Sequence, residues 1–370
     1  MTIFEFMKIK DLTNYIEGLI PLSSQENYDN CGLIYGNSDT PIKGVLVSLD
    51  CTEDIIEEAI RKNCNVVVSH HPIVFKGIKK LTGKNYVERT LIKAIQHDIA
   101  IYALHTNLDN YRFGVNYEIG KRLGLHKLKV LAPATDKLIK LVTFVPIAHL
   151  EKVQTALFGS GAGNIGDYDS CSFSLEGSGT FRSKLGSTPF VGELNELHTE
   201  KEVRLEVVLS THVKRKVISA LLESHPYEEV AYDLIPLINT NNYEGAGMVG
   251  ELEHPQDTLT FLKHVKSVFN CGCIRYTSLL KDKVQRIAFC GGSGSFLLPN
   301  AVQSGADLFI TGDYKYHDFF DADKQLVIAD IGHYESEQFT IELIGEQLKK
   351  KFVTFAVYFT ELNTNPVNYL

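Results

Sequence analysis

The sequence has no Cys-x-x-Cys motif and no long apolar run. Its seven cysteines are an odd number without such a pair, which favours free thiols in a reducing compartment over a disulfide framework. No apolar stretch approaches the ~18 residues of a membrane-spanning helix, and the N-terminal segment lacks a cleavage-site pattern. We therefore expect a soluble, cytoplasmic protein with no membrane partner.

The sequence also lacks an excess of positive charge. Its 370 residues include 37 Lys and Arg and 45 Asp and Glu, which give a formal net charge of -8 at pH 7. A negative protein repels phosphate backbones, so a nucleic-acid partner is disfavoured. A small anionic substrate is compatible with this charge, because a metal ion or a local lysine cluster can reverse the local field. The length suits two or three domains.

Strand and helix patterns alternate in both outer thirds of the chain. Apolar runs followed by polar residues predict strands, and amphipathic segments between them predict helices. The runs lie at 43–50, 65–71 and 99–109 near the N-terminus, and at 286–295, 306–318 and 325–337 near the C-terminus. Strands separated by helices predict a largely parallel sheet. We therefore expect a two-lobed α/β core.

The middle of the chain has a different pattern. A strand, a helix that starts near a histidine and a further β-like segment occur twice, with His149 and His212 at the helix starts. We interpret these histidines as packing residues. Two such units in tandem predict a ferredoxin-like α+β module with βαββαβ order. The glycine-containing stretch Asn242–Gly250 then predicts a linker back to the core.

These patterns divide the chain into three expected segments. The first core lobe occupies 1–136, the inserted ferredoxin-like domain 137–244, and the second core lobe 245–370. The α/β core is therefore expected to be discontinuous in sequence.

Two adjacent histidines mark the end of one predicted strand. His70 and His71 follow the β-branched run at 65–69, and Pro72 cannot continue a strand. A single histidine is more often a surface or core residue than a ligand. However, open α/β sheets bind their ligands at the carboxyl ends of strands. The pair therefore stands where a functional site would be expected, provided that partners reach it.

Three acidic or histidine side chains at other strand ends are candidate partners. Asp109 ends the strand predicted at 99–109, and His333 and Glu337 follow the strand that begins at 325. If the latter segment starts a helix, a spacing of four puts His333 and Glu337 on one face. The complete candidate set is His70, His71, Asp109, His333 and Glu337.

This donor set indicates a metal site that keeps open positions. Imidazoles suit zinc and neighbouring first-row metals, and carboxylates can bridge two ions. Five ligands cannot close two four-coordinate sites without bridging, which leaves room for water or substrate. We expect two divalent metal ions per subunit, with zinc preferred and manganese or iron as alternatives. Such a pair would lower the pKa of a water between the ions and polarise a substrate oxygen.

Other polar residues near these segments have two interpretations. His105 and Asn107 could orient ligands or could simply pack. Asp313 and His317 could contact ligands or substrate, or could form a turn and a helix start. The run Gly291–Ser295 could cradle a phosphate, although a tight turn is the preferred interpretation. Three lysines could attract an anion or form a solvated face: Lys76, Lys79 and Lys80.

Five motifs, in this order, resemble the Nif-three-like family, also called GTP cyclohydrolase 1 type 2 homologs. They are Asn27–Gly36, Ser69–Pro72, His105–Asp109, Thr311–Asp318 and Gly332–Glu337. The middle is similar to the PII/CutA-like insertion of long bacterial members, most clearly in the segment HPYEEVAYDLIPL, residues 225–237. Tyr28 and Cys31 depart from the tryptophan and valine that are frequent in the family, in a segment without a ligand motif.

The resemblance implies a dinuclear metal site at the same five residues. It also implies a toroidal homohexamer whose metal sites face an internal cavity, with the insertions as caps. A GTP cyclohydrolase opens the purine ring at C8 by hydrolysis, which a metal-activated water could perform. The chain has no recognisable guanine-reading motif.

Two functions of different classes follow from these observations. In the first, the protein is a metal-dependent hydrolase of a nucleotide or similar small anion, and Glu337 or a nearby acid moves the proton. In the second, it is a non-catalytic regulatory or scaffold protein with structural metals, whose insertion senses a ligand or partner. The open coordination favours the first, and the missing substrate motif favours the second. DNA threading through a ring conflicts with the acidic charge.

Overall fold

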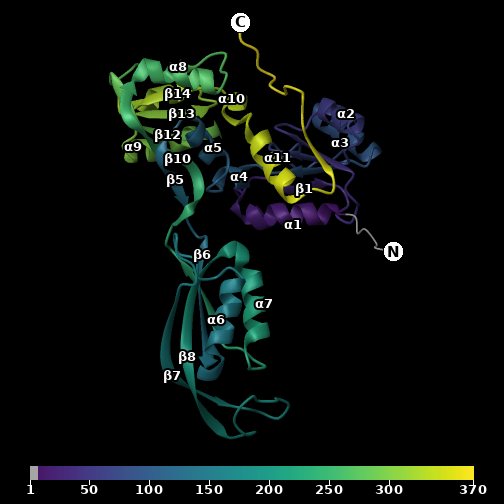
Figure 1. The fold of residues 1–370 in the computed structure, drawn as a ribbon, viewed down its shortest axis with the longest axis vertical. Coiled ribbons are helices and arrows are strands. Elements are labelled where there is room, and N and C mark those ends of the chain that lie inside the picture. The colour runs from purple at the N-terminus through teal and green to yellow at the C-terminus, as the bar shows by residue number, and fades with distance from the viewer. Residues whose placement is uncertain (1–6) are drawn as a thin grey trace. The chain divides into compact units, whose positions relative to one another are not determined.

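The structure, a computed structural model, describes residues 7–370, and the chain divides into two compact units. The first unit combines the segment that ends at Ala132 with Glu244–Leu370, and the second is the intervening segment Pro133–Tyr243. Residues 1–6, part of the N-terminal segment examined for a cleavage signal, lie outside the described range. Figure 1 shows the helices and strands that make up each unit.

A five-stranded sheet forms one half of the first unit. Its order is β1-β4-β3-β2-β15, with β1 antiparallel to β4 and the other neighbours parallel. The strands are β1 (Gly32–Tyr35), β2 (Gly44–Ser48), β3 (Val66–Ser69), β4 (Ala100–Ala103) and β15 (Ala356–Phe359). In register, Ser48, Ser69 and Ala103 lie side by side. The carboxyl ends of β2, β3 and β4 therefore lie next to one another.

A six-stranded sheet forms the other half of this unit, with the order β11-β14-β13-β12-β10-β5. The strands β12, β13 and β14 are parallel, whereas β10 and β11 run antiparallel to β12 and β14. The bounds are β5 (His126–Ala134), β10 (Asn241–Asp257), β11 (Arg275–Tyr276), β12 (Lys283–Ser293), β13 (Leu308–Gly312) and β14 (Val327–Asp330). The three parallel strands overlap the three apolar runs near the C-terminus, and the prediction of a mixed α/β chain is confirmed.

The stretch Asn242–Gly250 returns the chain from the second unit to the first, as predicted, but it does so as part of the long strand β10 and not as a loop. Its backbone pairs with β12, where Met248 faces Phe289. A Cβ atom added to Gly250 would lie 2.7 Å from the Leu128 side chain, so the glycine permits a close approach. Strand pairing with a distant segment therefore outweighs the weak strand propensity of the glycines.

Helices connect the strands of both sheets. In the N-terminal part they are α1 (Ile9–Leu19), η1 (Leu22–Ser24), α2 (Glu53–Arg61), α3 (Tyr86–Gln96), α4 (Thr106–Asn110) and α5 (Val115–Arg122). In the C-terminal part they are α8 (Thr258–Val268), η4 (Ser295–Leu297), α9 (Leu298–Gln303), η5 (Asp318–Ala322), α10 (His333–Glu337) and α11 (Thr340–Lys351). Within the described range, no helix has the length and apolar character needed to cross a membrane.

One continuous apolar core joins the two sheets of the first unit. Val66 and Tyr102 contribute to it from the first sheet, Phe289 and Ile310 from the second, and Phe261 from α8. All five side chains are buried. Since one core serves both sheets, the two halves of this unit stabilise each other.

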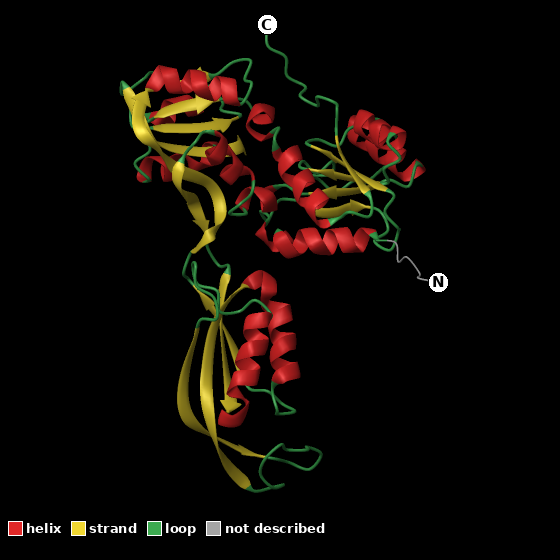
Figure 2. Cartoon of the chain, in the orientation of Figure 1, coloured by secondary structure: helices red, strands yellow, loops and turns green. Residues whose placement is uncertain are grey.

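The second unit has the element order βαββαβ. Its bounds are β6 (Leu138–Pro146), α6 (Leu150–Gly159), β7 (Ser172–Arg182), β8 (Leu197–Ser210), α7 (Lys214–Ser224) and β9 (Tyr232–Leu237). The sheet order is β7-β8-β6-β9, and all neighbours are antiparallel. The helices α6 and α7 lie side by side along one face of this sheet (Figure 2). His149 and His212 lie in the short turns η2 (Ile147–His149) and η3 (Thr211–Val213) that precede these helices.

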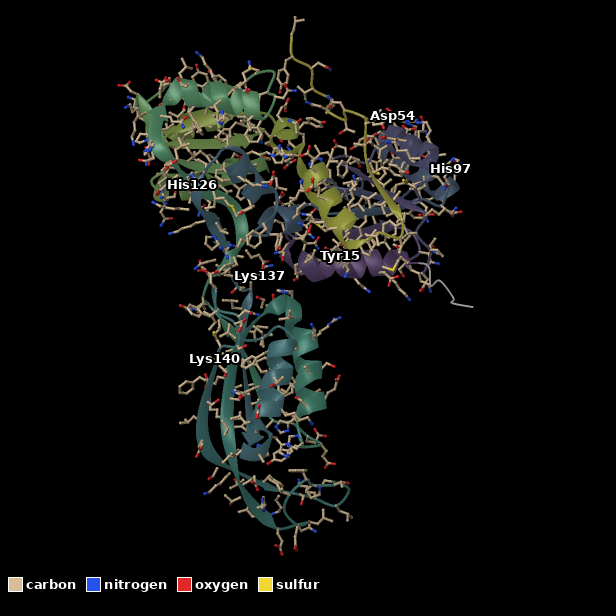
Figure 3. All side chains as sticks on the ribbon, viewed as in Figure 1. Tyr15, Asp54, His97, His126, Lys137 and Lys140 are labelled. Carbon is tan, nitrogen blue, oxygen red and sulfur yellow. The ribbon has the colours of Figure 1, made fainter. Side chains whose placement is uncertain are left out.

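The opposite face of this sheet is exposed. Lys140 points away from α6 and α7 (Figure 3), and its ammonium pairs with Glu206 at 2.9 Å. Phe173 and Leu175 of β7 lie in register with Glu206 and Arg204 and are also exposed. The core of the second unit therefore lies between the helices and the other face of the sheet.

Replacing Phe289 by alanine should destabilise the first unit by about 3–5 kcal/mol, because the change removes a fully buried ring and leaves a cavity. Phe296 is 63% exposed, and its replacement by alanine should change stability by less than about 0.5 kcal/mol. Urea unfolding followed by circular dichroism measures both effects. Equal effects of the two substitutions would contradict the central place of Phe289 in the core.

Candidate metal centre

Polar side chains gather where the parallel strands end. Asp50 follows β2, His70 and His71 follow β3, and His105 follows β4. Because these strands end side by side, their next residues emerge at the same edge. Asp109 reaches this edge from α4, one helical turn after His105.

The second sheet contributes His333 and Glu337 to the same place. The strand β14 ends at Asp330, and the short helix α10 begins at His333 and ends at Glu337. The spacing of four puts both side chains on one face, and His333 Nε2 lies 3.1 Å from Glu337 Oε2. Gly292 makes room for this carboxylate, because a Cβ atom there would lie 2.3 Å from Glu337 Oε1.

Glu337 stands between two groups of donor atoms. Its Oε2 lies 3.1 Å from His71 Nε2, and the Nε2 atoms of His71 and His333 are 3.2 Å apart. Its Oε1 lies 3.7 Å from His70 Nε2, which is also 3.7 Å from Asp109 Oδ1. The five residues proposed from the sequence thus lie together in the structure. Two overlapping triplets among them could hold a metal ion: His71, His333 and Glu337, and His70, Asp109 and Glu337.

His105 extends this donor set. Together with His70 and His71 it forms a third group of side chains whose donor atoms lie within 4.8 Å of one another. The sequence placed His105 beside Asp109 but did not distinguish an orienting role from packing. Its position two residues after the end of β4, equivalent to that of His71 after β3, is the signal that could have identified it.

Hydrogen bonds orient all four imidazole rings in the same way. Each Nδ1 atom faces an oxygen that can only accept, so Nδ1 carries a proton and Nε2 presents a lone pair in the neutral ring. The Nδ1 partners are Leu104 O for His70 at 2.7 Å, Asp50 Oδ1 for His71 at 2.7 Å, Asp29 Oδ1 for His105 at 2.8 Å and Asp313 Oδ2 for His333 at 2.7 Å. The rings are therefore arranged as metal ligands usually are.

Two buried atoms of this cluster have no hydrogen-bond partner among the described residues. They are His70 Nε2 and Asp109 Oδ1, and both are acceptors in the neutral imidazole and the carboxylate. A buried acceptor without a partner is unfavourable, since it has lost its water and gained nothing in exchange. A cation at this position would satisfy both atoms. The donor set therefore fits a divalent metal ion.

The histidines respond to the buried charge in opposite directions. Burial lowers the pKa of His70 to about 4. Burial also disfavours the charged form of His71, but its contacts with Asp50 and Glu337 raise its pKa to about 9. Burial likewise disfavours the charged form of His333, but its contacts with Glu337 and Asp313 raise its pKa to about 11. In the metal-free protein, protons on His71 and His333 thus compensate the carboxylates.

The two carboxyl groups of the cluster also differ. Burial and the charge of Glu337 raise the pKa of Asp109 well above its usual range. Burial opposes ionisation of Glu337 as well, but the charges of His333 and His70 hold its pKa well below the usual range. Ionisation is thus favoured at Glu337 and disfavoured at Asp109, where a bound cation would favour it.

The remaining residues suggested by the sequence have other contacts. Asn107 Oδ1 accepts the N–H of His105, so it supports the backbone of that ligand. His317 lies outside the donor groups and stacks on Phe320. The N–H groups of Gly291 and Gly292 already donate to Asn116 and Ser336, which leaves neither for a phosphate.

A cavity of about 1450 Å³ opens beside the donor set. His71, His105 and His333 are among its lining residues. Lys76, Lys79 and Lys80 also line it, and none forms an ion pair with a described residue. Aromatic side chains complete the wall: Phe75, Tyr86, Tyr334 and Tyr369. The cavity therefore offers positive charge and apolar surface in addition to the candidate metal ligands.

The C-terminal segment also reaches this site. The Thr364 hydroxyl donates to Asp50 Oδ2 at 2.5 Å, while the other oxygen of Asp50 accepts from His71. Asn365 donates to Glu335 at 3.2 Å. No sequence motif marked Asp50 or Thr364, because their roles depend on contacts between segments far apart in the chain.

Replacing Thr364 by valine should lower the affinity for divalent metal about 10-fold, because it loosens the Asp50 carboxylate that orients His71. Asp50→Asn should lower it up to about 100-fold, because it removes the charged partner of the His71 ring. Thr364→Ser, which keeps the hydroxyl, should restore the affinity. Competition with a chromophoric chelator measures these constants. Val367→Ala, elsewhere in the same segment, is the matched control. Unchanged affinity in Thr364→Val would show that this contact does not support the site.

Comparisons with known proteins were made for the whole chain. The sequence model of one family, described as Duf34/NIF3 (NGG1p interacting factor 3), matches residues 7–366. Two proteins named GTP cyclohydrolase 1 type 2 homolog are similar. That of Halalkalibacterium halodurans is 38% identical over 355 residues, which cover 95% of each chain. That of Bacillus subtilis strain 168 is 39% identical over 348 residues, which cover 92% of this chain and 93% of the relative.

Solved structures agree with this similarity. The crystal structure of a Bacillus cereus protein related to NIF3 superposes with a TM-score of 0.86 at 35% identity, covering 99% of this chain and 100% of the other. The crystal structure of Staphylococcus aureus protein SA1388 gives a TM-score of 0.77 at 31% identity, covering 99% of both chains.

Proposed function

Because the chain belongs to the Duf34/NIF3 family, we propose that it binds two divalent metal ions and hydrolyses a small nucleotide-like anion. The observation that carries the proposal is the arrangement around Glu337. One oxygen of this carboxylate faces His70, and the other faces His71 and His333. Two buried acceptor atoms beside it, on His70 and Asp109, have no hydrogen-bond partner among the described residues. This arrangement suits a bridging ligand between two cations.

The residues divide into two metal-binding groups. His71 and His333 would hold one ion, His70 and Asp109 the other, and Glu337 would contact both. His105 lies beside both groups as a sixth donor. Mixed nitrogen and oxygen donors favour zinc, with manganese or iron as alternatives. Bound there, the ions would supply Lewis acidity and lower the pKa of a nearby water.

The protein's own groups orient the substrate and handle its protons. Asp50 and Asp313 hold the rings of His71 and His333, so these ligands need no rearrangement when the substrate arrives. Glu337 lies between the two groups of imidazoles, and we propose that it or a nearby acid moves the proton. Lys76, Lys79 and Lys80 line the same cavity and would attract the anionic part of the substrate.

We also propose that residues 137–244 are an inserted PII/CutA-like module of the ferredoxin-like class within a discontinuous Nif-three-like core. The βαββαβ order and the strand order β7-β8-β6-β9 support this assignment. In solution we expect a homohexamer, as the resemblance implies, and the free cysteines favour a cytoplasmic location. Light scattering coupled to size exclusion measures the number of chains directly.

A second candidate function is a metal-binding regulator or scaffold without catalytic activity. The observation that favours it is a separate cavity of about 650 Å³ in the second unit. In that case the metal ions would stabilise the first unit, and the second unit would recognise a ligand. The two functions differ in whether the loaded protein consumes a substrate.

The wild-type chain should retain two metal ions after reconstitution and dialysis, measured by mass spectrometry of the released metal. Asp109→Asn should retain one, because it weakens the group of His70 and Asp109 and leaves that of His71 and His333. His317→Ala, which lies outside both groups, should retain two. A single ion in the wild type would contradict the dinuclear proposal.

Protein loaded with zinc, manganese or iron should consume GTP and release formate, because ring opening at C8 followed by hydrolysis liberates that carbon. Glu337→Ala should reduce turnover at least about 100-fold, since it removes the shared ligand. His317→Ala should retain turnover. Phosphate release without formate would indicate hydrolysis at the phosphates instead. If the metal-loaded wild type is no faster than Glu337→Ala on any nucleotide, the hydrolase proposal fails and the regulator remains.

A further inference from the structure

The second unit contains a cavity that lies wholly within Pro133–Tyr243 and shares no residue with the metal centre. Its volume of about 650 Å³ falls in the range of small-molecule pockets, which is about 300–1,000 Å³. The strands β7 and β8 line it, together with the loop after β7 and the segment that precedes β9. It therefore requires an explanation independent of the proposed hydrolysis.

Aromatic rings form the walls of this cavity. They belong to Phe144, Phe181, Phe190 and Tyr227. The Tyr227 ring lies 6.1 Å from both Phe181 and Phe190, at interplanar angles of 56° and 48°. Tilted rings at this spacing leave faces and edges available to a further ring. The walls thus favour a flat aromatic ligand.

A buried carboxylate lies among these rings. Glu202 is 8% exposed, and its Oε1 accepts the Tyr227 hydroxyl at 2.8 Å. Its Oε2 accepts no hydrogen bond from any described residue. Because Glu202 lines the cavity, this oxygen is available to a ligand that carries an N–H group.

Two glycines in β7 leave space beside this carboxylate. Gly177 and Gly179 pair in register with Glu202 and Glu200 of β8. A Cβ atom at Gly179 would lie 2.2 Å from Glu202 Oε2, whereas one at Gly177 would meet nothing within 4 Å. Glycine weakens a strand and often marks the approach of a ligand or another backbone. The strand β7 thus places no side chain beside Glu202 at these two positions.

The segment before β9 is held rigidly against the cavity. His225 Nε2 donates to Phe144 O at 3.0 Å, and its Nδ1 accepts the N–H of Tyr227 at 3.1 Å. The N–H of Thr188 donates to the Glu228 carboxylate at 2.9 Å, which ties the loop after β7 to this segment. The walls are therefore formed before a ligand binds.

Charges of both signs surround the opening. Arg182 and Lys184 stand beside Glu176 and Glu229 among the lining residues. Neither basic residue forms an ion pair with a described residue. A mixed rim gives no strong preference for an anion or a cation, so a ligand of little net charge fits best.

We propose that this cavity binds a compact heteroaromatic ring that carries an amino group. The ring packs against the aromatic side chains of Phe181, Phe190 and Tyr227, and its amino N–H donates to Glu202 Oε2. The proposal goes beyond the proposed hydrolase function, because it assigns a separate ligand site to the second unit.

The test uses 2-aminopurine, a fluorescent heteroaromatic amine, with the full-length chain treated with a chelator. The chain contains no tryptophan, so the probe can be excited without protein background. Stacking on the aromatic walls should quench the probe in a saturable manner. Purine, which lacks the amino group, should compete at least about 10-fold more weakly, as the loss of one hydrogen bond to a charged group predicts.

Two variants locate the site. Glu202→Gln should weaken binding at least about 10-fold, because the amide replaces a charged acceptor. Gly177→Val should abolish binding, because its side chain would enter space in which a Cβ atom meets nothing within 4 Å. Glu229→Gln, on the rim, is the matched control and should bind within about twofold of the wild type. Circular dichroism checks that each variant is folded.

Absence of saturable quenching in the wild type would overturn the proposal. Equal affinity in the wild type, Glu202→Gln and Gly177→Val would overturn it as well, since the probe would then bind elsewhere. His333→Ala separates the two sites, because it disrupts the metal centre and should leave this affinity unchanged. Failure of the hydrolase assays does not affect this outcome.

Discussion

The first unit is organised around one buried carboxylate. Glu337 is 2% exposed, and its oxygens face His70 on one side and His71 and His333 on the other. A buried charge is tolerated only when opposite charge and hydrogen bonds compensate it. The fold must therefore deliver positive charge to this point, as protons on imidazoles or as cations. The parallel strand ends of one sheet and the helix after β14 of the other meet this requirement together.

The surrounding residues keep the donor atoms in place whether or not a cation is bound. Each of the four imidazoles donates from Nδ1 to an oxygen of the protein, so each Nε2 faces the same small volume. Fixed ligands reduce the entropy lost when a metal or substrate binds. The same arrangement accounts for the opposed pKa shifts, since His70 has a neutral carbonyl as its Nδ1 partner whereas His71 and His333 have carboxylates.

The two cavities are chemically different and belong to different units. The cavity beside the metal centre combines imidazoles, carboxylates and lysines, which suits a charged substrate. The cavity of the second unit combines aromatic rings with one acceptor oxygen of Glu202, which suits a neutral ring. Each is built from residues of a single unit. Hydrolysis and ligand recognition can therefore be tested independently in the same chain.

Local patterns in the sequence determined the α/β class, the family resemblance and the five strand-end candidates, because apolar periodicity and polar residues after strands are short-range signals. The return of the chain at Asn242–Gly250 was predicted, but its strand conformation was missed, because that depends on pairing with the separate strand β12. The contacts of Asp29 with His105 and of Thr364 with Asp50 span 76 and 314 residues. Only the tertiary structure decided which nitrogen each histidine presents, because such hydrogen bonds form only after strand register has brought distant segments together.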